Sequence, residues 1–207
     1  MKKNEKIRQW EVSEGVEIIR EIGVNEGANV IDFGCGFGHY SLAASIAVGK
    51  SGNIYAIDNN KGILNYVETR INDLSLTNIT TIHKDETSFY DFDGSTIDCI
   101  MLYDILHGAN TDRFEILKEA CRILKNEGKL SILPFHLSNF RDKDGRKKKY
   151  KIEHLINEIC DFEFELSSTI DGRGVHFEKY HSPYYMKKGG IDFEDLERGI
   201  IYNFTKV

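Results

Sequence analysis

The sequence predicts an α/β fold, in which a mainly parallel β-sheet is covered by helices on both faces. Short apolar runs rich in β-branched residues alternate with segments of helical periodicity, as they do in βαβ units. Several of these runs are almost continuously apolar, which is typical of parallel strands buried on both faces. The expected strands cover residues 29–33, 53–58, 79–84, 97–102 and 129–134, and the expected helices lie near 40–48, 60–74 and 112–125.

A lead-in helix is expected before the first strand, within residues 1–28. Apolar residues recur at three- and four-residue intervals between Asn4 and Ile22, which marks one face of a helix. Gly23 follows this pattern and can terminate the helix. The chain is therefore expected to place one helix ahead of the sheet.

Side chains and glycines at the expected helix ends agree with this periodicity. Asn59 or Asn60 can cap the helix at 60–74, and Thr111 with Asp112 can open the helix at 112–125. Gly128 can end that helix in a left-handed turn.

The sequence of the last third of the chain does not decide which segment forms the final strand. Residues 150–160 form an amphipathic helical pattern, and residues 162–170 alternate like a strand. The closing strand could follow at 175–180, directly across a short turn, or at the terminal apolar run 200–204. These two pairings remain alternatives on the pattern alone.

A glycine-rich turn between the first strand and the next helix is the strongest functional signal. Residues 30–40 read VIDFGCGFGHY, so Gly34, Gly36 and Gly38 follow the carboxylate of Asp32. Glycines permit positive φ angles and leave no Cβ between the backbone and a ligand. A dinucleotide fingerprint needs glycine where His39 stands, and a carboxylate would repel a pyrophosphate. The turn therefore favours a nucleotide-like ligand that carries positive charge.

In these features the chain resembles the class I S-adenosylmethionine-dependent methyltransferases, whose first motif is an acidic residue followed by G-x-G-x-G. Asp58 ends the second apolar run, and Asp85 follows the third, where the family places acidic residues. Residues 117–130 resemble the family's helix-turn-strand pattern, with Glu127 in place of the first of two turn glycines. Four landmarks in the right order make the resemblance specific.

The resemblance implies a Rossmann-like, doubly wound sheet of seven strands, mostly parallel, with an antiparallel last strand at 200–207. It also implies one domain over residues 1–207. Its expected parts are the lead-in helix at 1–28, a cofactor-binding core at 29–134, and a substrate-side half at 135–207 that contains an insertion at 171–195.

The implied cofactor is S-adenosylmethionine, with S-adenosylhomocysteine as the product. Asp32 and the three glycines are expected to hold the methionine part, Asp58 the ribose and Asp85 the adenine. The expected cofactor-binding residues are Asp32, Gly34, Gly36, Phe37, Gly38, Tyr40, Asp58, Asn59, Asp85 and Tyr103.

A proton acceptor for the substrate is expected at the carboxyl ends of the strands, which form the rim of the site in such sheets. Tyr103, Asp104 and His107 follow the fourth strand, and His136 follows the fifth. His107 is the preferred base and His136 the second candidate, because histidine titrates near neutral pH. The alternative is that these histidines only shape the pocket.

The insertion at 171–195 is dense in aromatic residues and histidines. His176, His181, Tyr184 and Tyr185 are expected to bind a planar acceptor, or to pack against the domain. A metal site built from His176, His181 and Glu178 is disfavoured, because neither a strand nor a helix aligns all three side chains. We therefore expect no metal ion there.

Composition limits the classes of ligand and the cellular location that are expected for the chain. The formal net charge of −6 disfavours a general nucleic-acid binder. The motifs most resemble those of small-molecule methyltransferases of the quinone and sterol type, and this resemblance implies a small-molecule acceptor. No apolar run approaches the ~18 residues of a membrane span, and the four cysteines lack metal-ligand spacing, so a cytoplasmic protein with reduced thiols is expected. The sequence carries no signal of oligomeric state.

Three alternative functions stay open. The first is a nicotinamide oxidoreductase, which the glycine spacing opposes. The second is a noncatalytic protein that keeps the fold and binds the cofactor. The third is an RNA methyltransferase that uses the basic loop at 141–151, although acidic residues interrupt that loop.

Overall fold

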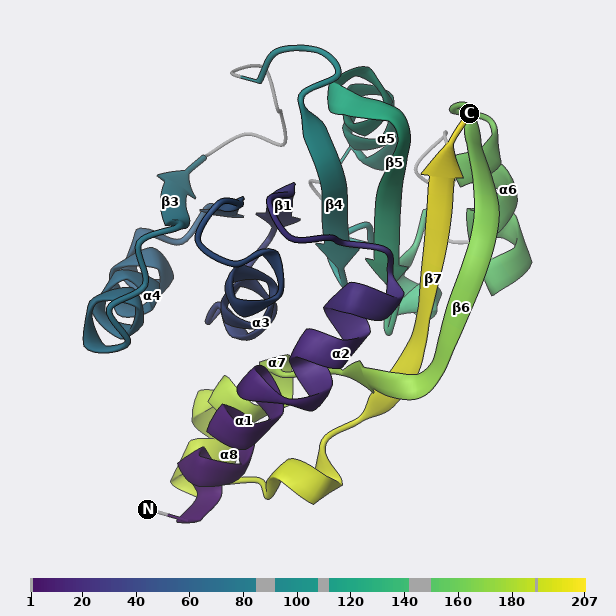
Figure 1. The fold of residues 1–207 in the computed structure, drawn as a ribbon. Coiled ribbons are helices and arrows are strands. Elements are labelled where there is room, and N and C mark those ends of the chain that lie inside the picture. Colours follow the sequence, from purple (N-terminus) through teal and green to yellow (C-terminus); the bar gives the residue numbers. More distant parts are fainter. Residues whose placement is uncertain (1, 85–91, 108–111, 142–149, 189) are drawn as a thin grey trace.

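The structure is a computed structural model that describes residues 2–84, 92–107, 112–141, 150–188 and 190–207. One seven-stranded sheet has the order β3-β2-β1-β4-β5-β7-β6 (Figure 1). Its strands are β1 (Asn29–Phe33), β2 (Asn53–Asp58), β3 (Ile79–His83), β4 (Ile97–Tyr103), β5 (Leu124–Leu133), β6 (Phe164–Val175) and β7 (Arg198–Lys206). Strand β7 runs antiparallel to both of its neighbours, β5 and β6, and the other pairs of adjacent strands among the described residues are parallel, so the predicted fold class is confirmed.

Helices cover both faces of the sheet, and each face has its own apolar core. The residues of α1, α2 and α3 pack with alternate residues of the central strands, including Val30 and Met101. Those of α5 and α6 pack on the other face against Ile31 and Ile100. The helices are α1 (Lys2–Val12), α2 (Glu14–Glu21), α3 (His39–Val48), α4 (Lys61–Asp73), α5 (Arg113–Ile123) and α6 (Ile152–Cys160).

The lead-in segment forms two helices, where the sequence pattern predicts one. The chain breaks between α1 and α2 at Ser13, whose backbone departs from helical geometry. Trp10 of α1 is buried and packs edge-on against Tyr40 and Phe177. The break thus lets α1 reach over toward the end of the sheet where the inserted segment lies.

Two of the predicted helix caps are present. The side chain of Asn60 accepts hydrogen bonds from the backbone of Gly62 and Ile63 at the start of α4. Asp112 does the same for the first turn of α5. Thr111, the other residue expected at that end, lies outside the described residues.

The turn between α5 and β5 differs from the prediction. Strand β5 begins at Leu124, directly after the helix, and the left-handed residue is Glu127, with φ of 62°, rather than Gly128. A left-handed conformation costs a side-chain-bearing residue about 1–2 kcal/mol. The position at which the family pattern carries its first turn glycine is therefore the one that requires it.

The closing strand is β7, as the resemblance implies, but the inserted segment is shorter than expected. Strand β6 continues to Val175, because its register shifts between Ile170 and Gly174 and the chain stays paired with β7. The insertion therefore begins at His176 and not at 171. It contains α7 (Glu178–His181), α8 (Pro183–Lys187) and the short helix η2 (Phe193–Asp195), and a separate short helix, η1 (Leu137–Asn139), follows β5.

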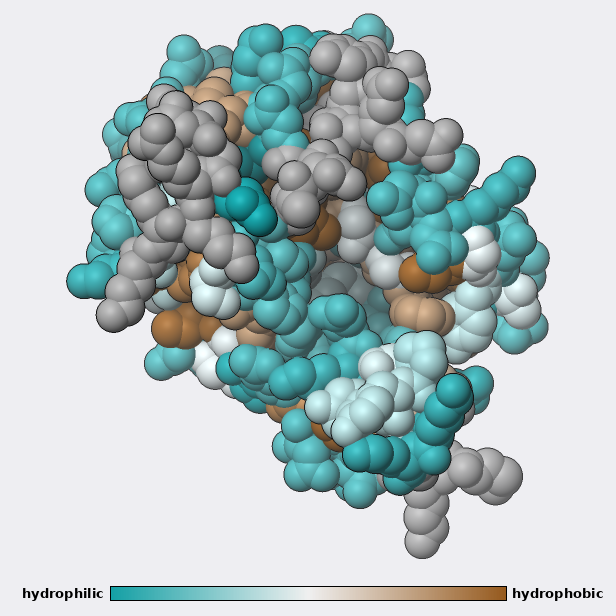
Figure 2. Space-filling model, turned by 180° about the vertical axis from the view of Figure 1, so that it is seen from behind, coloured by the Kyte–Doolittle hydropathy of each residue, from teal (hydrophilic) through white to brown (hydrophobic). Residues whose placement is uncertain are grey.

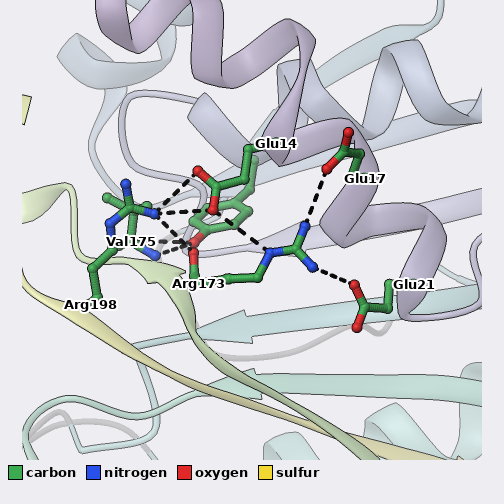
Figure 3. Close-up of polar contacts among 7 residues, drawn as sticks. Glu14, Glu17, Glu21, Arg173, Val175 and Arg198 are labelled. Atoms are coloured by element: carbon green, nitrogen blue, oxygen red, sulfur yellow. Dashed lines mark hydrogen bonds and ion pairs between the residues drawn. The ribbon is translucent and has the colours of Figure 1, made fainter.

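Ion pairs connect the C-terminal end of β6 and the N-terminal end of β7 to α2 (Figure 3). Arg173 contacts Glu14, Glu17 and Glu21, at 3.7, 3.4 and 2.5 Å, and Arg198 contacts Glu14 at 3.3 Å. Each pair is partly exposed and contributes little alone. Together they hold Arg173 of β6 and Arg198 of β7 against α2, close to the start of the inserted segment.

Figure 2 shows the opposite face of the molecule, where the described residues form a mainly hydrophilic surface with small, separate hydrophobic patches. Among the described residues, no helix combines the length and the apolar character needed to traverse a bilayer. All four cysteines are free thiols. Most of the basic loop at 141–151, namely 142–149, lies outside the described residues.

Candidate active site

A cavity of about 430 Å³ opens at the carboxyl ends of β1, β4 and β5 and is bounded on its other side by the inserted segment. This is the edge of the sheet at which open α/β folds bind ligands. Polar and aromatic side chains dominate its wall. The lining residues are Asp32, Gly34, Cys35, Gly36, Phe37, His39, Tyr40, Ile63, Tyr103, Asp104, Ile105, Leu133, Phe135, Val175, His176, Phe177, Glu178, His181, Ser182 and Pro183.

Gly34 and Gly36 of the glycine-rich turn line one wall of the cavity, and Gly38 is not among the described residues that line it. Gly34, Gly36 and Gly38 have φ angles of 76°, 50° and 75°. A Cβ on Gly34 would lie 2.3 Å from the Cγ2 atom of Ile105, which leads out of β4. Both the backbone conformation and the close packing therefore require glycine at this position.

Asp32 lies near the end of β1, just before the glycine-rich turn, and is almost fully buried where it lines the cavity. Its carboxylate accepts a hydrogen bond from the hydroxyl of Ser41 at 2.5 Å. Burial, opposed by that hydrogen bond and reinforced by the charge of Asp58, raises the pKa of Asp32 to about 6. Burial also raises the pKa of the neighbouring Cys35 thiol, which stays protonated. A buried carboxylate of this kind favours a positively charged ligand.

The tyrosines of the site contribute their rings, because their hydroxyls are engaged elsewhere. The hydroxyl of Tyr40 donates to the carbonyl of Val175 and accepts from its N–H, at 3.3 and 2.8 Å. The hydroxyl of Tyr103 lies 2.9 Å from that of Ser131. The two rings meet edge to face, with centroids 4.5 Å apart. With Phe37, they supply three of the aromatic surfaces that line the cavity.

Of the residues predicted to bind the ribose and the adenine, those that the structure describes do not line the cavity. Asp58 accepts hydrogen bonds from the backbone of Gly36 and Asn60, at 3.0 and 2.8 Å, and so braces the glycine-rich turn. Asn59 is exposed and its carbonyl lies 3.2 Å from Nε2 of His83. Neither Asp58 nor Asn59 is among the described residues that line the cavity. Asp85 lies outside the described residues.

The opposite end of the cavity is organised around Asp104, which follows β4. Its φ of 55° is left-handed, and its Oδ1 atom accepts a hydrogen bond from the backbone of Phe135 at 3.1 Å. Three histidines approach its carboxylate: Nδ1 of His107 at 3.4 Å, Nδ1 of His136 at 2.6 Å and Nε2 of His176 at 3.0 Å. Burial opposes ionisation, but these histidines hold the pKa of Asp104 well below its usual range. The two predicted bases therefore meet at one carboxylate.

His176 and Glu178 reach this end from the start of the inserted segment. Nε2 of His176 lies 3.2 Å from an oxygen of Glu178, and the ring stacks on Phe135 with centroids 4.3 Å apart. Burial alone would lower the pKa of His176. Asp104, Glu178 and Glu197 raise it by more than burial lowers it, so the pKa is raised overall. The structure thus separates His176 and Glu178 from His181, with which the sequence analysis had grouped them.

His181 belongs to a second network, which holds the inserted segment over the glycine-rich turn. Its Nε2 atom lies 2.7 Å from Nε2 of His39, and its ring stacks on Phe37 with centroids 3.6 Å apart. Nδ1 of His39 lies 2.5 Å from Glu11, which is also bound by Arg70 through two hydrogen bonds of 2.7 Å. We call Glu11, His39, Arg70 and His181 the latch network. It joins α1, α3, α4 and α7.

The two tyrosines predicted to bind the acceptor lie farther out. Tyr184 is 59% exposed, and its hydroxyl accepts a hydrogen bond from Lys188 at 2.6 Å. Tyr185 packs edge-on against Tyr184, with centroids 5.2 Å apart. Neither is among the described residues that line the cavity.

The latch network predicts a loss of stability in acid. Burial, opposed by Glu11, lowers the pKa of His39, and burial together with the charges of His39 and Arg70 lowers that of His181 to about 3. The unfolded chain, whose histidines titrate near 6.5, therefore binds more protons than the folded chain, between pH 6.5 and 3 for His181 and from pH 6.5 downward for His39. We expect the free energy of unfolding to be highest above pH 6.5 and to fall with pH by up to about 1.4 kcal/mol per unit for each group.

Urea unfolding at several pH values measures this slope. Other ionisable groups facing the pair are Glu11, Arg70, Tyr66 and Tyr180, so the comparison is with His181→Gln, which should be less sensitive to pH in this window. The His154→Gln variant, altered on the exposed surface of α6, should keep the parent slope. Equal slopes in all three proteins would contradict the prediction.

Glu11, Arg70 and Asp104 are the site residues that sequence patterns assigned least well. Asp104 stands directly after a strand, at the rim where functional residues gather, and that position is its signal. Glu11 and Arg70 occupy polar positions of amphipathic helices and carry no local signal. They join the latch network because α1 and α4 meet beside the start of α3.

Comparison with known proteins agrees with the fold and the glycine-rich turn. A family model described as a methyltransferase domain matches residues 30–128. Demethylmenaquinone methyltransferase from Shouchella clausii is 27% identical over 117 residues, which cover 56% of this chain and 49% of that protein. The chain thus spans about half the length of the curated relatives that it matches.

Solved structures extend the similarity over nearly the whole chain. A S-adenosylmethionine-dependent methyltransferase from Aquifex aeolicus superposes with a TM-score of 0.69 at 21% identity, covering 98% of both chains. Geranyl diphosphate methyltransferase in complex with S-adenosylmethionine gives a TM-score of 0.68 at 12% identity, covering 95% of this chain and 85% of that one. With the sheet order and the match over residues 30–128, they show that this part of the chain is similar to a methyltransferase domain and that the whole chain has the fold of the solved S-adenosylmethionine-dependent methyltransferases.

Proposed function

We propose that the chain transfers the methyl group of S-adenosylmethionine to a small planar acceptor held at the Asp104 end of the cavity. The observation that carries this proposal is the single cavity that joins the glycine-rich turn and Asp32 to Asp104 and His176. Cofactor and acceptor can therefore occupy adjoining parts of one enclosed space, which methyl transfer requires.

Bound S-adenosylmethionine supplies an activated methyl group on a positively charged sulfur. The residues of the chain provide alignment and shielding. Asp32 favours the positive charge, and the left-handed turn at Gly34 and Gly36 lets the backbone approach the cofactor. The inserted segment, held by the latch network, covers the turn and keeps water from the reacting atoms.

Aromatic side chains support a planar acceptor. Phe37, Tyr103, Phe135 and Phe177 all line the cavity. Rings of this kind stack on planar ligands and bury a large apolar area. Matching relatives are named for methylation of demethylmenaquinone and in ubiquinone and menaquinone biosynthesis, and we extend the quinone-type acceptor to this chain as part of the proposal.

Acceptor activation is assigned to the histidines around Asp104. His107 and His136 both contact its carboxylate, and their rings lie 4.8 Å apart. We keep both as proposed bases for an acceptor that must lose a proton, and His176 as a residue that contacts the acceptor. Tyr184 and Tyr185 could take part only if α8 moved toward the cavity, so we place them last among the proposed substrate-binding residues.

Cofactor binding is tested by Asp58→Ala. The change removes the carboxylate that braces Gly36 and that we propose to accept the ribose hydroxyls, so the affinity for S-adenosylhomocysteine should fall by about 1–3 kcal/mol. Isothermal titration calorimetry measures this loss, and Asp73→Ala, at the exposed end of α4, should bind like the parent. Unchanged affinity in Asp58→Ala would remove Asp58 from the binding site.

Turnover is tested with isotope-labelled S-adenosylmethionine and a panel of quinols, phenols and other small acceptors, analysed by mass spectrometry. Label should appear in a planar acceptor, and a noncatalytic protein would bind the cofactor without labelling any of them. Thermal stabilisation by NAD but not by S-adenosylhomocysteine would instead indicate an oxidoreductase. Label transferred to RNA, and lost when Lys147, Lys148 and Lys149 are reversed in charge, would indicate an RNA methyltransferase.

A further inference from the structure

We infer that Asp104, His136, His176 and Glu178 form a binding site for a divalent transition-metal ion, at the acceptor end of the cavity. Each of the four offers one ligand atom, and these atoms all lie within 4.8 Å of one another. They come from three places in the fold: the ends of β4 and β5 and the start of the inserted segment. We call these residues the four-ligand cluster.

The state of His176 is a second observation that points to a ligand. The residue is only 4% exposed, and neither ring nitrogen makes a hydrogen bond, although Nε2 faces oxygens of Asp104 and Glu178 at 3.0 and 3.2 Å. Buried polar atoms without a hydrogen bond are costly and uncommon in folded proteins. A metal ion between Nε2 and the two carboxylates would bind the lone pair of this nitrogen once His176 is deprotonated there.

The donor set selects the class of ion. Two imidazole nitrogens with two carboxylate oxygens suit Zn²⁺, Fe²⁺, Mn²⁺ or Co²⁺, whereas Mg²⁺ and Ca²⁺ prefer oxygen ligands. The two carboxylate charges would balance those of the ion when both histidines are neutral. Phe135 supports the geometry: its ring stacks on His176, and its backbone N–H orients Asp104. Outer contacts of this kind hold metal ligands in place.

The location of the cluster gives the ion access to whatever fills the cavity. Asp104, His176 and Glu178 all line it, and the side chain of Glu178 is 73% exposed, so it can yield a position to an incoming ligand. An ion there would bind an oxygen or sulfur atom of the acceptor and favour its deprotonated form. With the ion bound, His136 would serve as a ligand, which leaves His107 as the proposed base. This role rests on the proposed methyl transfer, whereas metal binding itself does not.

The test measures metal binding and cofactor binding separately on the full chain. Zn²⁺ and Co²⁺ are titrated into metal-free protein by calorimetry, with the visible spectrum of bound Co²⁺ as a second readout, and Mg²⁺ serves as the oxygen-preferring comparison. We expect one Zn²⁺ per chain, bound with a Kd near or below about 1 µM. We expect His176→Gln and Glu178→Gln to weaken it by about 100-fold or more.

Matched controls make the result decisive. His154→Gln and Glu194→Gln change exposed residues away from the cluster and should bind Zn²⁺ like the parent. The inference is wrong if the parent binds no Zn²⁺ or Co²⁺ in this range, or if His176→Gln and Glu178→Gln bind them as tightly as the controls. Circular dichroism spectra of the two cluster variants that match the parent show that they are folded. The affinity of the parent for S-adenosylhomocysteine, measured in a separate titration, tests the proposed function independently.

Discussion

The Glu11→Ala variant is expected to unfold with a free energy about 3–5 kcal/mol below that of the parent. Glu11 is 3% exposed and binds both Arg70 and His39. Burial alone would raise the pKa of Glu11, but its hydrogen bonds and opposite charges lower it overall, so the carboxylate is ionised in the folded protein. Its removal leaves the Arg70 guanidinium partly buried without a counter-charge, and a charge in that state is strongly destabilising.

Urea unfolding monitored by circular dichroism measures the loss. The matched control is Glu194→Ala, which breaks an ion pair with Lys6 on the surface and should leave stability close to that of the parent. Because the latch network also holds His181 over the glycine-rich turn, Glu11→Ala should bind S-adenosylhomocysteine more weakly as well. A loss of stability no greater than that of Glu194→Ala would show that the network does not hold these helices together.

Gly34→Ala is expected to destabilise the chain by about 2–5 kcal/mol and to abolish detectable cofactor binding. Two costs add in this variant. The left-handed φ of 76° disfavours any side chain, and the new Cβ would lie 2.3 Å from Cγ2 of Ile105. Relief of that contact must move either the glycine-rich turn or the segment that carries Asp104, and both form the cavity.

The two costs can be separated by two further variants. Gly36→Ala has a φ of 50° but nothing within 4 Å of its Cβ, so it should lose only the backbone part, about 1–2 kcal/mol. The double variant Gly34→Ala with Ile105→Ala removes the clash and should recover stability relative to Gly34→Ala. If Gly34→Ala were no less stable than Gly36→Ala, the close packing of the turn against Ile105 would not limit this position.

The fold was predictable because its signals are local. Parallel strands buried on both faces read as apolar runs, and the glycines of the turn mark backbone conformations that few other residues adopt. The parallel direction of the first five strands follows from their alternation with helices. The last strand was predictable only through resemblance to a family, since the pattern allowed two pairings and a register shift carried β6 on to Val175.

The sequence by itself determined the parallel sheet, the left-handed glycine-rich turn and the carboxylate of Asp32 beside it, because each depends on residues that are neighbours along the chain. Only the tertiary structure decided which distant side chains meet. His39 and His181 stand 142 positions apart, and Asp104 gathers histidines from three separate segments. No local period encodes such contacts, because the direction of each side chain depends on where the following loops return to the edge of the sheet.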